Sequence, residues 1–423
     1  MPKWYKLDNA AKIYPSVVNS QWEAIFRMSV DLTEDVDPNI LQQAQKRVLE
    51  RLPAFATTLK HGFFWFYLEH IDGQPPIEED IKNPMQKINR KRNNQFMYRL
   101  LYYKNRIAVE FFHSLTDGTG GMTFLMTLVN EYLRIKHGTK ICPSRYILNC
   151  DDEPDPEEYE DSFLRYGGKK TLGIAEKRSY QYPHTHTDFN RLLIVSGSVK
   201  TESLRKLAQK YDCKIGSFTT ALLIYSALQL QKADTRASQK KKPVKVCSTI
   251  NLRKMFPSRT LRNFSAFVNP GLYGILGDYS LAEVVEYVKH FMGMYVNKKQ
   301  QLAKFSYNVD AERNIFIRIA PLFIKIPILI IAYIVAGDVN QCSTMSNLGL
   351  LDLPEEVGRY VKRADFMLGR SFFNRSSCAC VSYDGTTVFN FTRNIKESEL
   401  ERIFFSTLVE EGVEVFIESN GRD

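Results

Sequence analysis

The sequence predicts a mixed α/β fold. Strand-like apolar runs alternate with apolar stripes at helical spacing through most of the 423-residue chain. The composition, 44% hydrophobic and 12% aromatic, supports a substantial buried core. A chain of this length usually holds about two or three domains. We therefore expect a mixed α/β protein with more than one domain.

The first half of the chain alternates strands with helices. Residues 23–32 have the pattern of a strand, and Asp37 followed by Pro38 is typical of a helix start. Two aliphatic and aromatic runs, 95–103 and 107–112, predict a hairpin with a short polar turn. A glycine-rich turn and another apolar helical stripe follow the hairpin.

The second half repeats this alternation. A strand is expected over residues 192–199, and Ser217 is expected to cap a long apolar helix. Ser280 and Glu283 have the spacing of a capping box. Asp384-Gly385 between two apolar runs predicts a second tight hairpin.

The two halves share an order of elements: strand, tight turn, strand, then a helix with an apolar stripe. Counting eight residues from the turn gives His113 after Asn105, and Thr392 after Asp384. We therefore hypothesise two related domains, of which only the first keeps an ionisable base. Different strand topologies in the two halves would contradict this hypothesis.

An acidic segment separates the halves. Eight of the eleven residues in 151–161 are Asp or Glu, which is typical of a solvated connection. We place an acidic linker region at 150–190, between an N-terminal domain over 1–180 and a C-terminal domain over 190–423.

Charge and cysteine usage indicate the cellular setting. The net charge of +10 fits anionic ligands such as phosphorylated cofactors. The seven cysteines are odd in number and form no CxxC pair, which indicates reduced thiols and a cytoplasmic protein. Strand alternation places Cys378 and Cys380 on one face, where we expect both to be buried.

Membrane segments are not expected. The amino terminus has no apolar signal-peptide core. The most apolar stretch, 315–336, is interrupted by two charged residues and two prolines, which leaves too short a run for a spanning helix. We expect a buried or surface-docking helix there, in a soluble protein.

Several common motifs are missing. The sequence has no GxxxxGK phosphate loop, no HExxH zinc motif and no GxSxG nucleophile elbow. Gly118, Gly120 and Gly121 do not complete a GxGxxG dinucleotide motif. Basic residues are scattered, which argues against nucleic-acid binding. We assign no metal to His184 and His186.

The remaining candidate is His113, which follows an apolar strand and precedes the glycine-rich turn. A rigid strand end can hold an imidazole at an open cleft, and histidine is the side chain best suited to general-base work near neutrality. Asp117, four residues on, can brace the turn or orient the ring. Gly118 would supply a backbone conformation closed to other residues. A purely structural histidine is the alternative.

The spacing HxxxDG over 113–118 resembles the active-site motif of the chloramphenicol acetyltransferase-like, or condensation-domain-like, acyltransferase superfamily. The run 251–253 followed by Phe-Val-Asn at 267–269 resembles a later condensation-domain segment. The Ser-Asn-Leu-Gly sequence at 346–349 and the opening stretch 7–15 resemble the alcohol acetyltransferase-like branch. The resemblance spans nearly the whole chain.

This resemblance implies two chloramphenicol acetyltransferase-like α/β sandwich domains, with the active-site tunnel at their interface. It implies acyl transfer from acyl-CoA, as co-substrate, to a hydroxyl or amine, without a covalent acyl-enzyme or a permanently bound cofactor. The alternative is a free-standing condensation enzyme that takes its acyl group from an acyl-carrier protein. Phe112 stands where condensation domains carry a first histidine, and the plant DFGWG segment is missing, which favours a small-molecule acyltransferase.

The resemblance also implies roles for individual residues. His113 would be the general base, and Arg253 would pair with Asp117 beneath the site. Ser346 and Asn347 would bind the thioester oxygen, although a simple turn is an equal alternative. The lysines at 240–242 would either meet the phosphates of coenzyme A or form a solvated loop. We expect a monomer, because one chain supplies both sides of the cleft.

Overall fold

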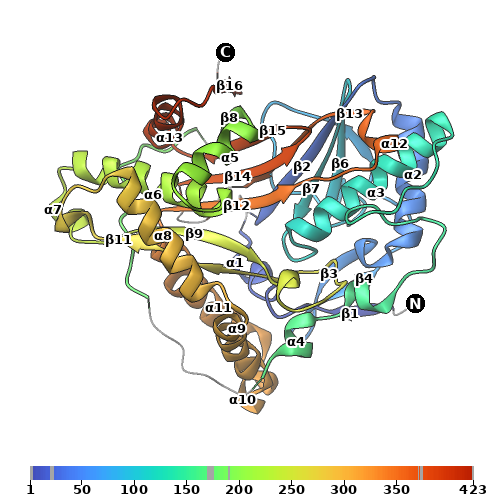
Figure 1. Ribbon diagram of the computed structural model, residues 1–423. Helices are drawn as coiled ribbons and strands as arrows, with labels where there is room; N and C mark the ends of the chain where they lie inside the picture. Colours follow the sequence, from blue (N-terminus) through green and yellow to red (C-terminus); the bar gives the residue numbers. More distant parts are fainter. Residues whose placement is uncertain are drawn as a thin grey trace.

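The computed structural model describes residues 3–19, 23–168, 176–188, 191–369, 371 and 375–421. Figure 1 shows two main sheets covered by helices, with a smaller sheet below one of them. The mixed α/β class expected from the sequence is confirmed. No helix among the described residues is both long enough and apolar enough to cross a membrane.

The first main sheet is built mostly from the first half of the chain. Its strand order is β13-β2-β7-β6-β5. The bounds are β13 (Val361–Leu368), β2 (Ile25–Leu32), β7 (Arg106–Phe112), β6 (Tyr98–Tyr103) and β5 (Ile77–Glu79). Helices α2 (Pro38–Arg51) and α3 (Gly118–His137) pack against it and share its hydrophobic core.

The second main sheet comes entirely from the second half. Its strand order is β10-β9-β12-β14-β15-β8-β16, with β11 paired to β9. The strands are β8 (Leu193–Lys200), β9 (Val244–Asn251), β10 (Ser265–Val268), β11 (Gly271–Leu272), β12 (Ser343–Leu350), β14 (Ser376–Tyr383), β15 (Thr386–Arg393) and β16 (Phe416–Ser419). The helices around its core are α5 (Thr201–Lys210), α6 (Ile215–Ala233), α8 (Leu281–Tyr295) and α13 (Glu399–Glu410).

Five strands have the same arrangement in both sheets. β2-β7-β6 corresponds to β8-β15-β14, and all of these neighbours are antiparallel. An antiparallel strand lies on one side of each set, β13 or β16, and a parallel strand lies on the other, β5 or β12. The shared topology expected from the sequence is confirmed.

The position equivalent to His113 differs from the one predicted. The turn residues with positive φ are Lys104 and Asp384, so these two residues correspond, rather than Asn105 and Asp384. The equivalent of His113 is therefore Arg393 and not Thr392. Arg393 forms a buried ion pair with Glu401, so its guanidinium has a structural role in the second half.

The remaining elements connect the two main sheets or lie at their edges. The small sheet has the order β1-β4-β3. These strands and the other helices are β1 (Trp4–Lys6), β3 (Thr57–His61), β4 (Phe66–His70), α1 (Tyr14–Val17), α4 (Ser162–Tyr166), α7 (Ala237–Lys240), α9 (Lys298–Arg313), α10 (Ile315–Ile319), α11 (Leu322–Ala336) and α12 (Glu355–Gly358). Short 3-10 helices are η1 (Pro53–Phe55), η2 (Pro156–Tyr159), η3 (Leu252–Lys254), η4 (Gly274–Leu276) and η5 (Asp338–Asn340).

Most local signals in the sequence act as expected. The Asp37 side chain accepts hydrogen bonds at the start of α2, and the Ser280–Glu283 capping box forms at the start of α8. Cys378 and Cys380 are both buried in the second core. The expected cap at Ser217 is wrong, because α6 begins at Ile215 and no side chain caps it.

The acidic segment is more ordered than a solvated connection. Glu158 is buried and pairs with Arg51 of α2 through two hydrogen bonds of 2.6 and 2.7 Å. Asp161 caps α4. Carboxylates in this segment therefore hold it against the first half. Residues 169–175 and 189–190 of the proposed 150–190 linker lie outside the described residues, and the domain bounds 1–180 and 190–423 stay predictions.

Candidate active site

His113 lies directly after β7, where the strand leaves the first main sheet. Its backbone N–H donates to the carbonyl of Ala24 at 2.8 Å. The Tyr14 ring stacks on the imidazole with 4.6 Å between centroids, and Phe26 makes an edge contact at 5.1 Å. The ring is partly exposed. Aromatic packing on two sides therefore fixes the plane of the imidazole.

The tautomer of His113 follows from its contact with Asn263. The Asn263 Nδ2 donates to the His113 carbonyl at 3.0 Å and to the Asp8 carboxylate at 3.2 Å. Because both partners are acceptors, the Oδ1 of the amide faces His113 Nδ1, at 3.0 Å. Nδ1 must therefore donate its proton to Asn263, which leaves the lone pair on Nε2.

The second ring nitrogen, Nε2, is not held by the described part of the protein. It has no hydrogen-bond partner among the described residues, and it does not belong to their fully buried unpaired polar atoms. Burial lowers the pKa of His113 from its ordinary value, although its own backbone and Asp117 oppose this shift. The imidazole is therefore neutral near pH 7, which is the state that a general base requires.

The opening segment of the chain supports this arrangement. Asp8 is buried, accepts from the backbone N–H of Ala11 at 2.8 Å, and lies 3.6 Å from the Arg262 guanidinium. Its other contact is the amide of Asn263. The same segment carries Tyr14, which stacks on His113. Residues near the amino terminus therefore orient a group about a hundred positions later.

Asp117 fixes the turn between His113 and α3. Its Oδ1 accepts the backbone N–H groups of Thr119 and Gly120, both at 3.1 Å, as the N-cap of the helix. Its Oδ2 accepts from Arg253 Nη1 and from the Phe264 N–H, both at 2.8 Å. Asp117 therefore braces the turn and does not touch the imidazole.

Arg253 connects this turn to the second half of the chain. Besides Asp117, its guanidinium donates to the carbonyls of Thr260 and Arg262 at 2.9 and 2.6 Å. Both charged groups are largely buried. The two residues that the sequence suggested as partners therefore lie together, with their polar atoms satisfied.

Close packing, and not the backbone conformation expected from the sequence, explains why position 118 is a glycine. Gly118 begins α3 without a positive φ, so backbone strain does not require it. A Cβ there would lie 3.0 Å from the Leu348 side chain, which indicates close packing instead. Gly120 is the stricter position, because a Cβ would meet the Leu261 carbonyl at 1.9 Å.

Ser346 and Asn347 lie on β12. The next residue of this strand, Leu348, packs against Gly118. Ser346 Oγ hydrogen-bonds Thr249 at 3.0 Å, and Asn347 Oδ1 accepts from the Gly349 N–H at 2.7 Å. No contact joins either side chain to His113 among the described residues. The structure therefore places this strand beside the motif, and an oxyanion role stays a prediction.

The other candidates lie elsewhere. Lys240 and Lys241 are exposed at the end of α7, at the left edge of the molecule in Figure 1, and Lys242 is partly exposed. His184 and His186 contact each other edge to face at 5.0 Å. Neither group lies with His113.

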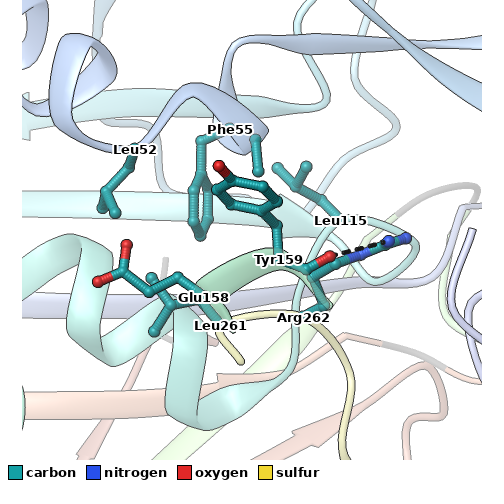
Figure 2. Close-up of a pocket in the computed structure, with 8 residues that line it drawn as sticks. Leu52, Phe55, Leu115, Glu158, Tyr159, Leu261 and Arg262 are labelled. Carbon is teal, nitrogen blue, oxygen red and sulfur yellow. Dashed lines mark hydrogen bonds between the residues drawn. The ribbon is translucent and has the colours of Figure 1, made fainter. Parts of the chain in front are cut away.

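A small pocket lies behind the motif turn (Figure 2). It includes Leu115 of the motif and Leu261 and Arg262 of the facing segment, where Arg262 donates to the Tyr159 carbonyl at 3.5 Å. Its full lining is Leu52, Ala54, Phe55, Leu115, Glu158, Tyr159, Leu261 and Arg262. Since His113 is not part of it, this pocket is distinct from the expected active-site tunnel, which stays a prediction.

Solved structures share this architecture. TRI101 of F. graminearum, in complex with coenzyme A and T-2 mycotoxin, matches with a TM-score of 0.62 at 10% identity, over 97% of this chain and 99% of its own. The trichothecene 15-O-acetyltransferase TRI3 of Fusarium sporotrichioides matches with a TM-score of 0.59 at 12% identity, over 96% of each chain. The chain has the chloramphenicol acetyltransferase-like fold.

This fold also serves a second kind of chemistry. The starter condensation domain of rhizomide synthetase, in complex with C8-CoA and Leu-SNAC, matches with a TM-score of 0.62 at 10% identity, over 98% of each chain. No protein-family model and no curated protein matches the sequence. At these identities the comparisons establish the chloramphenicol acetyltransferase-like fold, and the reaction has to be argued from the site.

Three residues of the site were missed by the sequence reasoning. Asn263, Asp8 and Tyr14 surround the imidazole but form no recognisable motif with it. Tyr14 and Asp8 belong to the opening stretch that resembles other members of the superfamily, which was the available signal. Asn263 follows Arg253 by ten residues, and its contact depends on a loop whose path the pattern does not reveal.

Proposed function

We propose that this protein transfers an acyl group from acyl-CoA to a hydroxyl or amine acceptor, with His113 as general base. The observation that carries the proposal is the neutral imidazole whose Nδ1 proton is held by Asn263 while Nε2 stays unpaired. The fold supports it, since structures of the same fold hold coenzyme A or an acyl-CoA.

In this reaction, Nε2 of His113 removes the acceptor proton as the acceptor oxygen or nitrogen attacks the thioester carbonyl. The tetrahedral intermediate then collapses, the carbon–sulfur bond breaks, and the imidazolium returns the proton to the departing thiolate. General-base assistance of this kind typically contributes about 10²–10⁴ in rate. Alignment of the two substrates contributes more, on the order of 7–11 kcal/mol of barrier.

Ser346 and Asn347 are proposed to stabilise the oxyanion of that intermediate. β12 supports this role because Leu348, the next residue, lies against the motif glycine. In other acyl-transfer enzymes, one such donor is worth about 2.7–4 kcal/mol. We also propose a monomer that acts in the cytoplasm, where its cysteine thiols would remain reduced.

The test measures release of free coenzyme A thiol from acetyl-CoA and longer acyl-CoAs against a panel of alcohols and amines. We expect His113→Ala to reduce the rate by about 10²–10⁴. His184→Ala is the matched control, because His184 lies outside the site, and it should leave the rate unchanged. Equal rates for wild type and His113→Ala would overturn the assignment of the base.

A condensation-type enzyme is the second candidate, supported by the fold match to a starter condensation domain. The acyl donor would then be a phosphopantetheinyl carrier protein. Offering acyl-CoA and acyl-carrier protein in one assay separates the two. Preferential use of the carrier would replace the first proposal and still require His113.

A further inference from the structure

The apolar helices α10 and α11 leave one large surface uncovered. We define the α10–α11 face by six of its exposed apolar residues, which are Phe63, Phe316, Phe323, Ile328, Ile331 and Val335. Phe316 is 76% exposed, Phe323 71% and Phe63 68%. Large apolar side chains that are exposed together in this way mark an interaction site.

The start of α11 is anchored to the aromatic turn before β4. Leu322 of α11 is buried, and its N–H donates to the Phe63 carbonyl at 2.8 Å. Lys325 turns inward, donates to the Phe64 carbonyl at 2.8 Å and lies 3.7 Å from the centre of the Trp65 ring. The aromatic turn before β4 and the start of α11 therefore form one unit, although they are far apart in the sequence.

The exposed residues of α11 lie on one side of the helix. At 3.6 residues per turn, the exposed positions described in α11 fall within an arc of about 180°; they are 323, 324, 327, 328, 331, 332 and 335. The opposite side, which includes Leu322, packs on the protein. In the neighbouring helix α10, by contrast, all five residues are exposed, including Ile315, Ile317 and Ile319.

The charge of this region has a single sign. Residues 313–337 contain no Asp or Glu and carry three cations, Arg313, Arg318 and Lys325. Arg318 is exposed among the isoleucines of α10 and forms no ion pair with the described carboxylates. Between the flanking Glu312 and Asp338, the exposed charged residues are Arg313 and Arg318, since Lys325 is buried. An apolar surface with these cations complements an anionic interface.

We propose that the α10–α11 face docks on the surface of a lipid bilayer that contains anionic lipids. Apolar side chains on all sides of a one-turn helix need an environment that can surround them, as acyl chains do. Arg318 and Arg313 can then reach lipid phosphates while their neighbours enter the hydrocarbon boundary. Basic groups near the cytoplasmic leaflet are attracted by its anionic lipids.

A second copy of the chain fits this face less well. A twofold contact would bring Arg318 of each copy into an apolar interface, and no carboxylate within 313–337 could pair with it. Figure 1 shows α10 at the bottom of the molecule, with α9 and α11 rising from it. The proposal does not depend on the proposed reaction.

Vesicle sedimentation with the full chain tests this docking. We expect binding to vesicles of phosphatidylcholine mixed with phosphatidylserine, and weaker binding to phosphatidylcholine alone. The double variant Phe316→Ser/Phe323→Ser should lower the partition coefficient by more than about tenfold. Arg318→Glu should remove most of the preference for the anionic vesicles. Both changes lie on exposed side chains, so thermal unfolding should be unchanged.

The matched control is Leu276→Ser, which removes an equally exposed apolar side chain (77%) on η4 and should bind vesicles like wild type. The proposal is overturned if wild type binds neither vesicle, or if Phe316→Ser/Phe323→Ser binds as wild type does. It is also overturned, in favour of self-association, if light scattering shows a dimer that dissociates in the double variant while vesicle binding is absent.

Discussion

The side-chain amide of Asn263 determines which ring nitrogen of His113 carries the proton. Asn263 offers its two N–H groups to acceptors and thereby presents its oxygen to Nδ1. An aspartate at that position would add a negative charge beside the imidazole and raise its basicity. The neutral amide orients the ring without that charge, which agrees with a pKa lowered by burial.

The pH dependence of kcat/KM should report this environment. Because only neutral His113 can accept a proton, activity is lost as the pH falls through the pKa of the free enzyme. Burial lowers that pKa, so the acidic limb should lie below the ordinary histidine value of about 6.5. A limb well above that value, measured from pH–rate profiles, would contradict the neutral, desolvated imidazole.

Asn263→Leu tests the positioning of the ring. The variant keeps the side-chain volume but removes the acceptor of the Nδ1 proton. We expect kcat to fall by roughly ten- to a hundredfold, a part of the general-base contribution, with KM little changed. Asn93→Leu is the control, since Asn93 is equally buried and its amide likewise donates to two acceptors, here the carbonyls of Phe96 and Tyr98, outside the site. It should reduce stability and leave kcat unchanged.

At the scale of elements, the start of α3 is fixed from two directions. Asp117 caps the helix through backbone N–H groups and also binds Arg253 from the second half of the chain. The same carboxylate therefore ends the turn that carries His113, begins a helix and joins two segments. This arrangement explains how a turn rich in glycine can hold His113 in one place.

Asp117→Ala should consequently impair folding as well as turnover. The change leaves the largely buried Arg253 without its counter-ion, which typically costs about 3–5 kcal/mol. Chemical denaturation measures the loss, and Asp117→Ala/Arg253→Met should recover part of it. Lys232→Ala, which removes a solvent-exposed ion pair with Asp278, should have no measurable effect. Wild-type stability of Asp117→Ala with activity lost would refute the structural role.

Local signals explain which elements could be predicted from the sequence. Asp37, the Ser280–Glu283 pair and Asp384-Gly385 act through backbone atoms a few residues away, so their patterns suffice. The contacts of Asp8 and Glu158 depend instead on partners far along the chain, and composition alone indicated a solvated acidic segment. The site was therefore predicted at the motif, whereas its support from Asp8 and Asn263 was not.

At the scale of the molecule, strand β13 joins the two halves. It comes from the second half but pairs with β2 along seven register positions, from Val361 opposite Leu32 to Leu368 opposite Phe26. Phe366 and Ala364 contribute to the first core. The first sheet is therefore complete only when both halves are folded.

Because β13 completes the first sheet from the second half of the chain, we predict a single cooperative unfolding transition. All three tryptophans lie within the first 65 residues, so their fluorescence follows mainly the first half, with Trp65 also sensing its contact with Lys325. Far-UV circular dichroism follows the whole chain. In a denaturant titration the two curves should coincide. Separate midpoints, with fluorescence changing before circular dichroism, would show that the halves unfold independently.

The late position of β13 in the sequence also delays completion of the first sheet during synthesis. About 250 residues separate Phe112 from Val361, so at roughly 5–20 residues per second the ribosome needs about 12–50 s to deliver the missing edge. Throughout that interval the edge of β2 that later binds β13 is unpaired, and it can pair with strands of other nascent chains. Production of this protein should therefore depend on chaperone capacity more strongly than its folded stability would suggest.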